Sequence, residues 1–315
     1  RLADAYGEEI ARDIWTLNKN AFRELKAALE KQLIDYSLCS AVRLAEEPFE
    51  VREIEMATEL AKEVLPDINL SDGKGAFFGY RVQTIPNAVM TFNGDRLIQS
   101  LLEGITRAQA HVSEVQEEGD GVLVSCGQKY FKSEVFVGAA HLALQELLSL
   151  PDGSLVAYAE QSAEHDILSD RGLLPEDTLI SWKYNLVSAL LSDSTLSVYG
   201  CRYVLHHAGV GQQKAEFNQN VSDAQMAEVR RTLKLDLPKA EKVYTRLECK
   251  ACDELPLIGP SSGGSRMLFA SGFGLQGFAL GYMAGKWLAD LIHFGNCETL
   301  PRICWPERLR SLGEK

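Results

Sequence analysis

Apolar side chains recur every three or four positions in several stretches of the chain, with charged residues between them. This spacing predicts amphipathic helices over residues 4–34, 50–64 and 96–108, and a shorter helix over residues 225–233. Another helix, over residues 275–292, is apolar on most of its surface. Segments with a different pattern separate these helices.

Those segments are rich in β-branched and aromatic residues and are bounded by turn-forming residues. They predict strands over residues 35–44 and 77–85, and a meander of short strands over residues 111–137. The last of these strands, residues 135–137, is apolar throughout. An apolar run without alternation indicates burial on both faces, as in a parallel sheet.

A second strand-rich region has few helices. Strands are predicted over residues 154–161, 179–190, 194–205 and 242–251. Strands in series favour an antiparallel sheet that is distinct from the first region. The whole pattern predicts an α/β fold that is α+β in part.

The C-terminal region contains a glycine-rich turn between a strand and the apolar helix. The strand covers residues 267–270 and the turn residues 271–274, and the helix carries Gly277, Gly281 and Gly285 at spacings of four. Each interior glycine costs about 1 kcal/mol of helix propensity, so this spacing predicts close packing against another backbone. Free N–H groups at a helix N-terminus also favour a negatively charged ligand. A packed core helix and a phosphate or cofactor site both remain open.

Composition narrows the class of protein. The chain has 315 residues, 46% hydrophobic and 24% charged, with 32 Lys and Arg against 44 Asp and Glu and a net charge of −12. This excludes collagen-like, disordered and coiled-coil chains, and the length suggests about two domains. The acidic balance argues against nucleic acid and anionic membranes as partners, and no apolar run reaches the ~18 residues of a membrane span.

Seven cysteines, an odd number widely scattered, favour reduced thiols and a cytoplasmic protein. Cys249 and Cys252 form a lone C-x-x-C pair. A zinc site normally needs a second pair with matching spacing, so no metal site is predicted.

Four stretches together resemble a known family. They are the meander that ends in VFVGAA, the paired strands of residues 179–202, the motif D-x-x-P-x-I-G at Asp253, Pro256, Ile258 and Gly259, and the closing SGFGLQGF turn and helix. The chain resembles the D-amino-acid oxidase and glycine/sarcosine oxidase superfamily of FAD-dependent oxidoreductases. Its γ-glutamylputrescine-oxidase-like branch is the most similar.

The resemblance implies positions for FAD. The turn would lie under the flavin, the VFVGAA strand would end at the pyrophosphate, and a valine would lie near the adenine. The implied cofactor-binding residues are Val112, Gly138, Ala139, Ala140, Gly272, Phe273, Gly274, Leu275, Gln276 and Gly277. Without the resemblance, Val112 alone would be interpreted as a core residue of a strand.

The resemblance also implies a discontinuous organisation. It divides the chain into an FAD-binding Rossmann-like domain of residues 1–36, 91–150 and 251–300, an antiparallel-sheet substrate domain of residues 37–90 and 151–250, and a C-terminal tail of residues 301–315.

The family begins with a βαβ unit carrying G-x-G-x-x-G, and no segment here matches that motif. We therefore expect an N-terminally incomplete FAD-binding domain. Either the protein is longer, or a partner chain supplies the βαβ unit, or this relative has lost the cofactor.

The implied function is oxidation of a C–N bond in a small amine or amino acid, by hydride transfer to FAD and hydrolysis of the imine. Candidate substrate-binding residues are Lys183, Tyr184, Arg202 and Arg246, among which arginine is the better carboxylate clamp. The sequence identifies no catalytic residue. The alternative is a flavin-free relative that acts as a non-catalytic scaffold or subunit.

Overall fold

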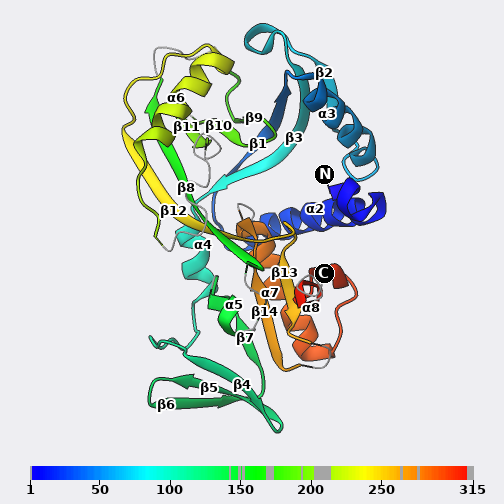
Figure 1. Ribbon diagram of the computed structural model, residues 1–315, viewed down its shortest axis with the longest axis vertical. Coiled ribbons are helices and arrows are strands. Elements are labelled where there is room, and N and C mark those ends of the chain that lie inside the picture. Colours follow the sequence, from blue (N-terminus) through cyan, green and yellow to red (C-terminus); the bar gives the residue numbers. More distant parts are fainter. Residues whose placement is uncertain are drawn as a thin grey trace. The chain divides into compact units, whose positions relative to one another are not determined.

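The computed structural model divides the chain into two compact units, whose elements are labelled in Figure 1. Unit 1 comprises Arg1–Thr16, Ile34–Asn93 and Tyr158–Leu247; unit 2 comprises Leu17–Leu33, Gly94–Ala157 and Glu248–Lys315. The structure describes residues 2–141, 143–147, 150, 153–167, 174–192, 194–201, 214–262, 265–274 and 277–310. The assignment of one part of the chain to FAD binding and another to substrate binding stays a prediction.

Helices form in the five stretches where the three-to-four spacing of apolar residues predicts them, but the helix expected over residues 96–108 ends at Leu101. The helices are α1 (Leu2–Tyr6), α2 (Glu8–Lys31), α3 (Pro48–Ala61), α4 (Gly94–Leu101), α5 (Ala143–Leu147), α6 (Gln219–Leu233), α7 (Gly277–Phe294) and α8 (Glu307–Arg310), with short 3-10 turns η1 (Gly75–Phe77) and η5 (Arg302–Cys304). The short helices α5 and α8 were not predicted. Within the described residues, no helix has both the length and the apolar character needed to cross a lipid bilayer.

An eight-stranded sheet forms the centre of unit 1 (Figure 1). Its order is β12 (Lys242–Ala251), β8 (Leu155–Asp166), β11 (Thr195–Gly200), β10 (Val187–Ser192), β9 (Thr178–Trp182), β1 (Tyr36–Ala45), β3 (Arg81–Phe92) and β2 (Asn69–Asp72). The pairs β2–β3, β1–β3, β9–β10, β10–β11 and β8–β11 are antiparallel, as predicted. β1 and β9 run parallel, which the sequence did not indicate.

The prediction of one strand over residues 179–190 is wrong. β9 ends at Trp182 and β10 begins at Val187, and these two residues face each other across an antiparallel pair. The chain therefore reverses over residues 183–186. The alternation of apolar and polar residues continues through both strands, which is why the pattern conceals the turn.

The helix α6 packs against the strand β11 of this sheet (Figure 1). Its buried residues Val221 and Val229 join Ile180 and Leu196 in one apolar core. Burial of these side chains, each contributing about 1.5 to 3 kcal/mol, holds the helix on the sheet.

Unit 2 contains a small sheet in the order β13 (Leu257–Pro260), β14 (Met267–Ser271) and β7 (Phe136–Gly138). β13 is antiparallel to β14, and β14 is parallel to β7. The predicted strand at residues 267–270 is confirmed as β14. Phe269, fully buried, belongs to a core that also includes Leu144, Leu257 and Leu309.

The predicted meander is present in part, as a separate sheet of β4 (Glu114–Glu118), β5 (Gly121–Cys126) and β6 (Lys129–Ser133). Its expected last strand, residues 135–137, belongs instead to β7 in the small sheet. The carboxylate of Glu117 links the sheet of β4, β5 and β6 to the loop between β13 and β14. One oxygen of Glu117 accepts hydrogen bonds from the hydroxyl of Ser265 at 2.5 Å and the backbone N–H of Arg266 at 2.6 Å.

Burial of β7 on both faces was predicted and is wrong for the described structure. β7 is an edge strand of its sheet, and the side chain of Val137 is 47% exposed. Its partner β14, which lies between two strands, carries the fully buried Phe269 instead. An apolar run therefore marked a parallel strand correctly but not its place in the sheet.

Candidate functional site

Two turns meet at one edge of the small sheet in unit 2. β7 and β14 are parallel, with Gly138 opposite Phe269, so both strands end at the same edge. Ala139 and Ala140 follow the first strand, and Gly272 follows the second. The hydroxyl of Ser271 donates a hydrogen bond of 3.4 Å to the carbonyl of His141, which connects the two turns directly. In open α/β sheets, ligands bind outside the carboxyl ends of parallel strands.

The glycines of these turns are required by the backbone and by close packing beneath it. Gly272 has a φ of +72°, and a β-carbon there would lie 3.2 Å from the backbone nitrogen of Ala251. A β-carbon on Gly138 would lie 2.8 Å from the ring of Phe269. The surface above is lined by small side chains, since Ala139 and Ala140 are both exposed. A ligand can therefore approach the backbone closely at this edge.

The second turn ends at the N-terminus of α7, which begins at Gly277. The first N–H groups of a helix have no partner within it, and the helix dipole adds partial positive charge there. Negative charge is therefore favoured at this point. This is the part of the predicted site whose electrostatics follow from the fold alone.

The close packing predicted for the glycine face of α7 is not found. Among the described residues, nothing lies within 4 Å of a β-carbon built on Gly277 or Gly285, and on Gly281 the nearest atom is 3.9 Å away, in the ring of Phe273. The buried face of α7 is instead formed by Leu280, Ala284, Trp287 and Leu288. The four-residue spacing marks one face of the helix but does not identify what covers it.

The structure brings seven of the ten predicted cofactor residues to this edge. They are Gly138, Ala139, Ala140, Gly272, Phe273, Gly274 and Gly277. Leu275 and Gln276 lie outside the described residues. Val112 is half-buried in the segment just before β4, next to a different sheet.

Sequence reasoning missed His141, the residue that follows the small side chains after β7. It has a φ of +52°, which is uncommon for a residue other than glycine. Partial removal from water lowers the pKa of its imidazole below the usual range, which favours the neutral ring at pH 7. A polar residue directly after Gly138-Ala139-Ala140 was the available signal.

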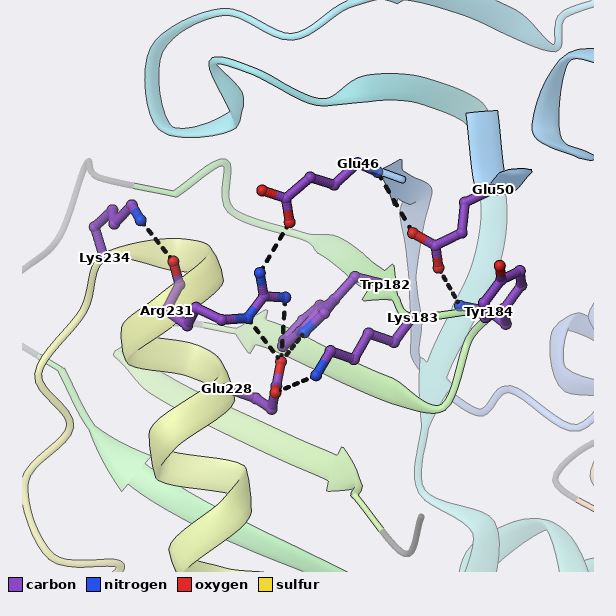
Figure 2. Close-up of polar contacts among 8 residues, drawn as sticks. All are labelled: Glu46, Glu50, Trp182, Lys183, Tyr184, Glu228, Arg231 and Lys234. Atoms are coloured by element: carbon purple, nitrogen blue, oxygen red, sulfur yellow. Dashed lines mark hydrogen bonds and ion pairs between the residues drawn. The ribbon is translucent and has the colours of Figure 1, made fainter. Parts of the chain in front are cut away.

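The candidate substrate residue Tyr184 lies in the reversal between β9 and β10 in unit 1. Lys183, Tyr184 and Asn185 all have positive φ, of 50°, 58° and 62°. Such a run of left-handed residues costs of order 1 to 3 kcal/mol each unless the surroundings hold it. Figure 2 shows one such contact: the buried carboxylate of Glu50 accepts the backbone N–H of Tyr184 at 3.1 Å.

A second carboxylate holds the same turn. Glu228 on α6 accepts hydrogen bonds from the ammonium of Lys183 and from the indole of Trp182, and pairs with Arg231 (Figure 2). Burial raises the pKa of Glu228, but the hydrogen bond and charge of Lys183, with the charge of Arg231, outweigh it and hold the pKa below its usual range. Lys183 is thus engaged in an ion pair with α6.

The candidate substrate residue Arg246 lies on a different strand from the turn that carries Tyr184. Arg246 is exposed on β12, and β8, β11 and β10 separate that strand from β9 in the sheet. Arg202 lies outside the described residues. The sheet order therefore does not place Arg246 beside Tyr184.

The C-x-x-C pair is not built as a metal or redox site in the structure. Cys249 is buried on β12 and Cys252 is exposed, and both are free thiols. Burial raises the pKa of Cys249 to about 11. Within the described part of the chain, no cluster of three or more His, Cys, Asp or Glu side chains has the geometry to hold a metal ion.

Comparison with known proteins gives a consistent picture. The DAO family, described as FAD dependent oxidoreductase, matches residues 2–291. No curated protein sequence matches the chain.

The similar solved structures include L-proline dehydrogenase from P. horikoshii, at 14% identity over 94% of this chain and 83% of that chain with a TM-score of 0.74. Glycine oxidase from Geobacillus kaustophilus is 13% identical over 92% and 80%, with a TM-score of 0.73. Iminodiacetate oxidase from Chelativorans sp. BNC1 is 16% identical over 92% and 83%, with a TM-score of 0.70. These likenesses show the shared fold, and the family match extends over nearly the whole chain. The chain therefore belongs to the DAO family of FAD-dependent oxidoreductases.

Proposed function

We propose that the protein binds FAD at the carboxyl edge of β7 and β14 and oxidises a C–N bond in an amine or amino acid. The observation that carries this proposal is the meeting of two small-residue turns at the ends of parallel strands, beside the N-terminus of α7. The γ-glutamylputrescine-oxidase-like branch remains part of the proposal.

The residues at this edge fit FAD. Small side chains let a large planar cofactor approach the backbone, and the helix N-terminus favours its negative charges. A β-carbon on Gly272 would be strained at φ +72° and would lie 3.2 Å from Ala251. The seven residues brought together here carry no acidic side chain that would repel a diphosphate.

FAD bound at this edge would supply a two-electron acceptor for oxidation of the C–N bond to an imine, which water would hydrolyse. The chain itself supplies binding and electrostatics. The N-terminus of α7 stabilises negative charge near the turn, and the turn residues fix the distance of closest approach.

On the substrate side, we propose Tyr184 and Arg246 as separate candidates for substrate binding, because β8, β11 and β10 lie between their strands. Arg202 is a further candidate, and an arginine would hold a carboxylate. Glu50 and Glu228 support this role for Tyr184 because they fasten the turn on which it lies. The guanidinium group suits a carboxylate because it can donate two parallel hydrogen bonds. Of the two arginines, Arg246 is in the described part of the chain and is exposed.

The experiment places a negative charge at the proposed FAD edge. In Ala140→Glu, the new carboxylate lies on an exposed position, so the fold is expected to persist. Two like charges about 4 Å apart repel by about 1 to 4 kcal/mol, and 1.4 kcal/mol is a tenfold change in affinity. We expect the Kd for FAD, measured by quenching of flavin fluorescence on the full chain, to rise about tenfold or more.

The matched control is Ala27→Glu, which adds the same charge to an exposed position of α2 in the same unit. Its affinity for FAD should equal that of the unchanged protein. Equal affinity of Ala140→Glu and Ala27→Glu would show that FAD does not bind at this edge. A chain that binds no FAD at all would favour the flavin-free scaffold.

A further inference from the structure

The segment of residues 301–310 follows the part of the chain that the DAO family matches, which ends at residue 291. It is nevertheless packed into unit 2. Cys304 and Leu309 are fully buried, and Leu309 shares an apolar core with Ala251, Leu257 and Phe269. A segment predicted as a tail therefore contacts the strands that carry the proposed cofactor edge.

Arg308 of this segment binds the first residue of the D-x-x-P-x-I-G motif. Its Nε donates to one carboxylate oxygen of Asp253 at 2.7 Å, and its Nη2 to the other at 3.0 Å. The same Nη2 donates to the carbonyl of Leu255 at 2.7 Å. The side chains of Arg308 and Asp253 are only 13% and 9% exposed. A bidentate, largely buried pair of this kind fixes orientation as well as distance.

The ring of Trp305 packs against the last residue of the same motif, Gly259. Gly259 has a φ of +134°, and a β-carbon there would lie 2.8 Å from the ring of Trp305. The glycine is therefore needed where the C-terminal segment crosses β13. Arg308 and Trp305 hold the two ends of the motif from one short segment.

The motif in turn lies directly against the proposed cofactor turn. Around Gly272, a β-carbon would meet the backbone nitrogens of Ala251 at 3.2 Å and Leu257 at 3.7 Å. The next residue, Phe273, forms a backbone bridge with Lys250. A shift of residues 251–257 would consequently move the backbone of the turn, because tightly packed groups transmit displacement.

We propose that Arg308 is a positioning residue for FAD binding: through Asp253 and Leu255 it holds residues 251–257 in the place that shapes the turn at Gly272 and Phe273. This inference rests on the proposed function, since it assumes that FAD binds at that turn. It gives the C-terminal segment a part in cofactor affinity. Removing Arg308 leaves the carboxylate of Asp253 buried without its cation. We expect residues 251–257 to shift so that this carboxylate reaches water.

The test compares FAD binding by the full chain with that of Arg308→Ala and Arg107→Ala. Arg107 is an exposed arginine of the same unit and serves as the matched control. Residues that act through packed neighbours change coupling by about 0.5 to 2 kcal/mol, which is roughly two- to thirtyfold in affinity. We expect Arg308→Ala to weaken FAD binding within that range and Arg107→Ala to leave it unchanged.

Chemical rescue separates positioning from general loss of structure. Millimolar methylguanidine can occupy the space of the missing guanidinium and should restore part of the FAD affinity of Arg308→Ala. It should not improve the double variant Asp253→Asn with Arg308→Ala, which lacks the carboxylate. If Arg308→Ala does not fold, Arg308→Lys keeps the charge but not the two-pronged geometry, and its affinity should fall several-fold.

The outcomes distinguish this inference from the proposed site. Unchanged FAD affinity in the folded Arg308 variant, with weakened binding in Ala140→Glu, would overturn the role of Arg308 alone. Unchanged affinity in Ala140→Glu would remove the proposed site and this inference with it. Weakened binding that methylguanidine does not restore would also contradict positioning through the ion pair.

Discussion

At the scale of single residues, the environment decides what the C-x-x-C pair can do. Cys249 is 3% exposed on β12, and burial raises its pKa to about 11. The thiolate is the reactive and metal-binding form, so Cys249 is inert near neutral pH. Cys252, three residues later, is exposed. The C-x-x-C pattern in the sequence therefore does not show that its two thiols differ in reactivity.

We expect iodoacetamide at pH 8 to modify Cys252 and to spare Cys249 in the folded protein. A pKa of about 11 leaves so little thiolate that alkylation of Cys249 should be at least about a hundredfold slower than for an ordinary thiol. Peptide mass spectrometry measures both sites, and the urea-unfolded chain, in which both react, is the control. Equal rates in the folded protein, or a disulfide between the two, would contradict this assignment.

At the scale of elements, the turn between β9 and β10 depends on distant carboxylates. Lys183, Tyr184 and Asn185 all adopt left-handed backbone conformations, although none of them is glycine. Glu50 lies 134 positions from Tyr184, and Glu228 lies 45 positions from Lys183. No local pattern contains this information, which is why the sequence predicted one long strand here. The flanking strands themselves followed from their alternation.

Glu228 makes the stability of unit 1 depend on pH. Its pKa is held below that of the unfolded chain, so the stabilisation is complete above about pH 4.5 and is lost as the pH falls through the lower folded value. We expect Glu228→Gln to reduce the free energy of unfolding by about 1 to 2 kcal/mol at pH 7, less than a fully buried pair would give because Lys183 and Arg231 are partly exposed. Urea unfolding monitored by circular dichroism measures this change.

The difference between Glu228→Gln and the unchanged protein should narrow between about pH 5 and pH 3, as the carboxyl group becomes protonated. Glu298→Gln, at an exposed position of unit 2, is the control and should match the unchanged protein at each pH. A difference that stays constant with pH would mean that Glu228 stabilises by packing and not by its charge.

At the scale of the whole molecule, the sequence motifs identified the segments of the proposed site. They did not identify the residues that pack against those segments. The turn at Gly272 and Gly274 and the helix after it were visible in the sequence, because glycine at such a turn is required by backbone conformation. The pairing of that turn with Gly138 depended on family resemblance, since contacts between strands whose paired residues are 131 positions apart leave no local signal. Whether the glycine face of α7 and the side chain of Val137 are covered depends on neighbouring segments. The spacing of residues in the sequence does not specify those neighbours.

The central claim, that the protein is an FAD-dependent oxidoreductase of C–N bonds, is tested most directly by an absorption spectrum of the purified full chain from about 300 to 550 nm. We predict absorption bands at about 370 and 450 nm, as for oxidised flavin. They should be present after purification, or after FAD has been added and the excess removed. Without oxygen, an amine or amino-acid substrate should bleach the band near about 450 nm. A chain that stays colourless and retains no added FAD would contradict the account.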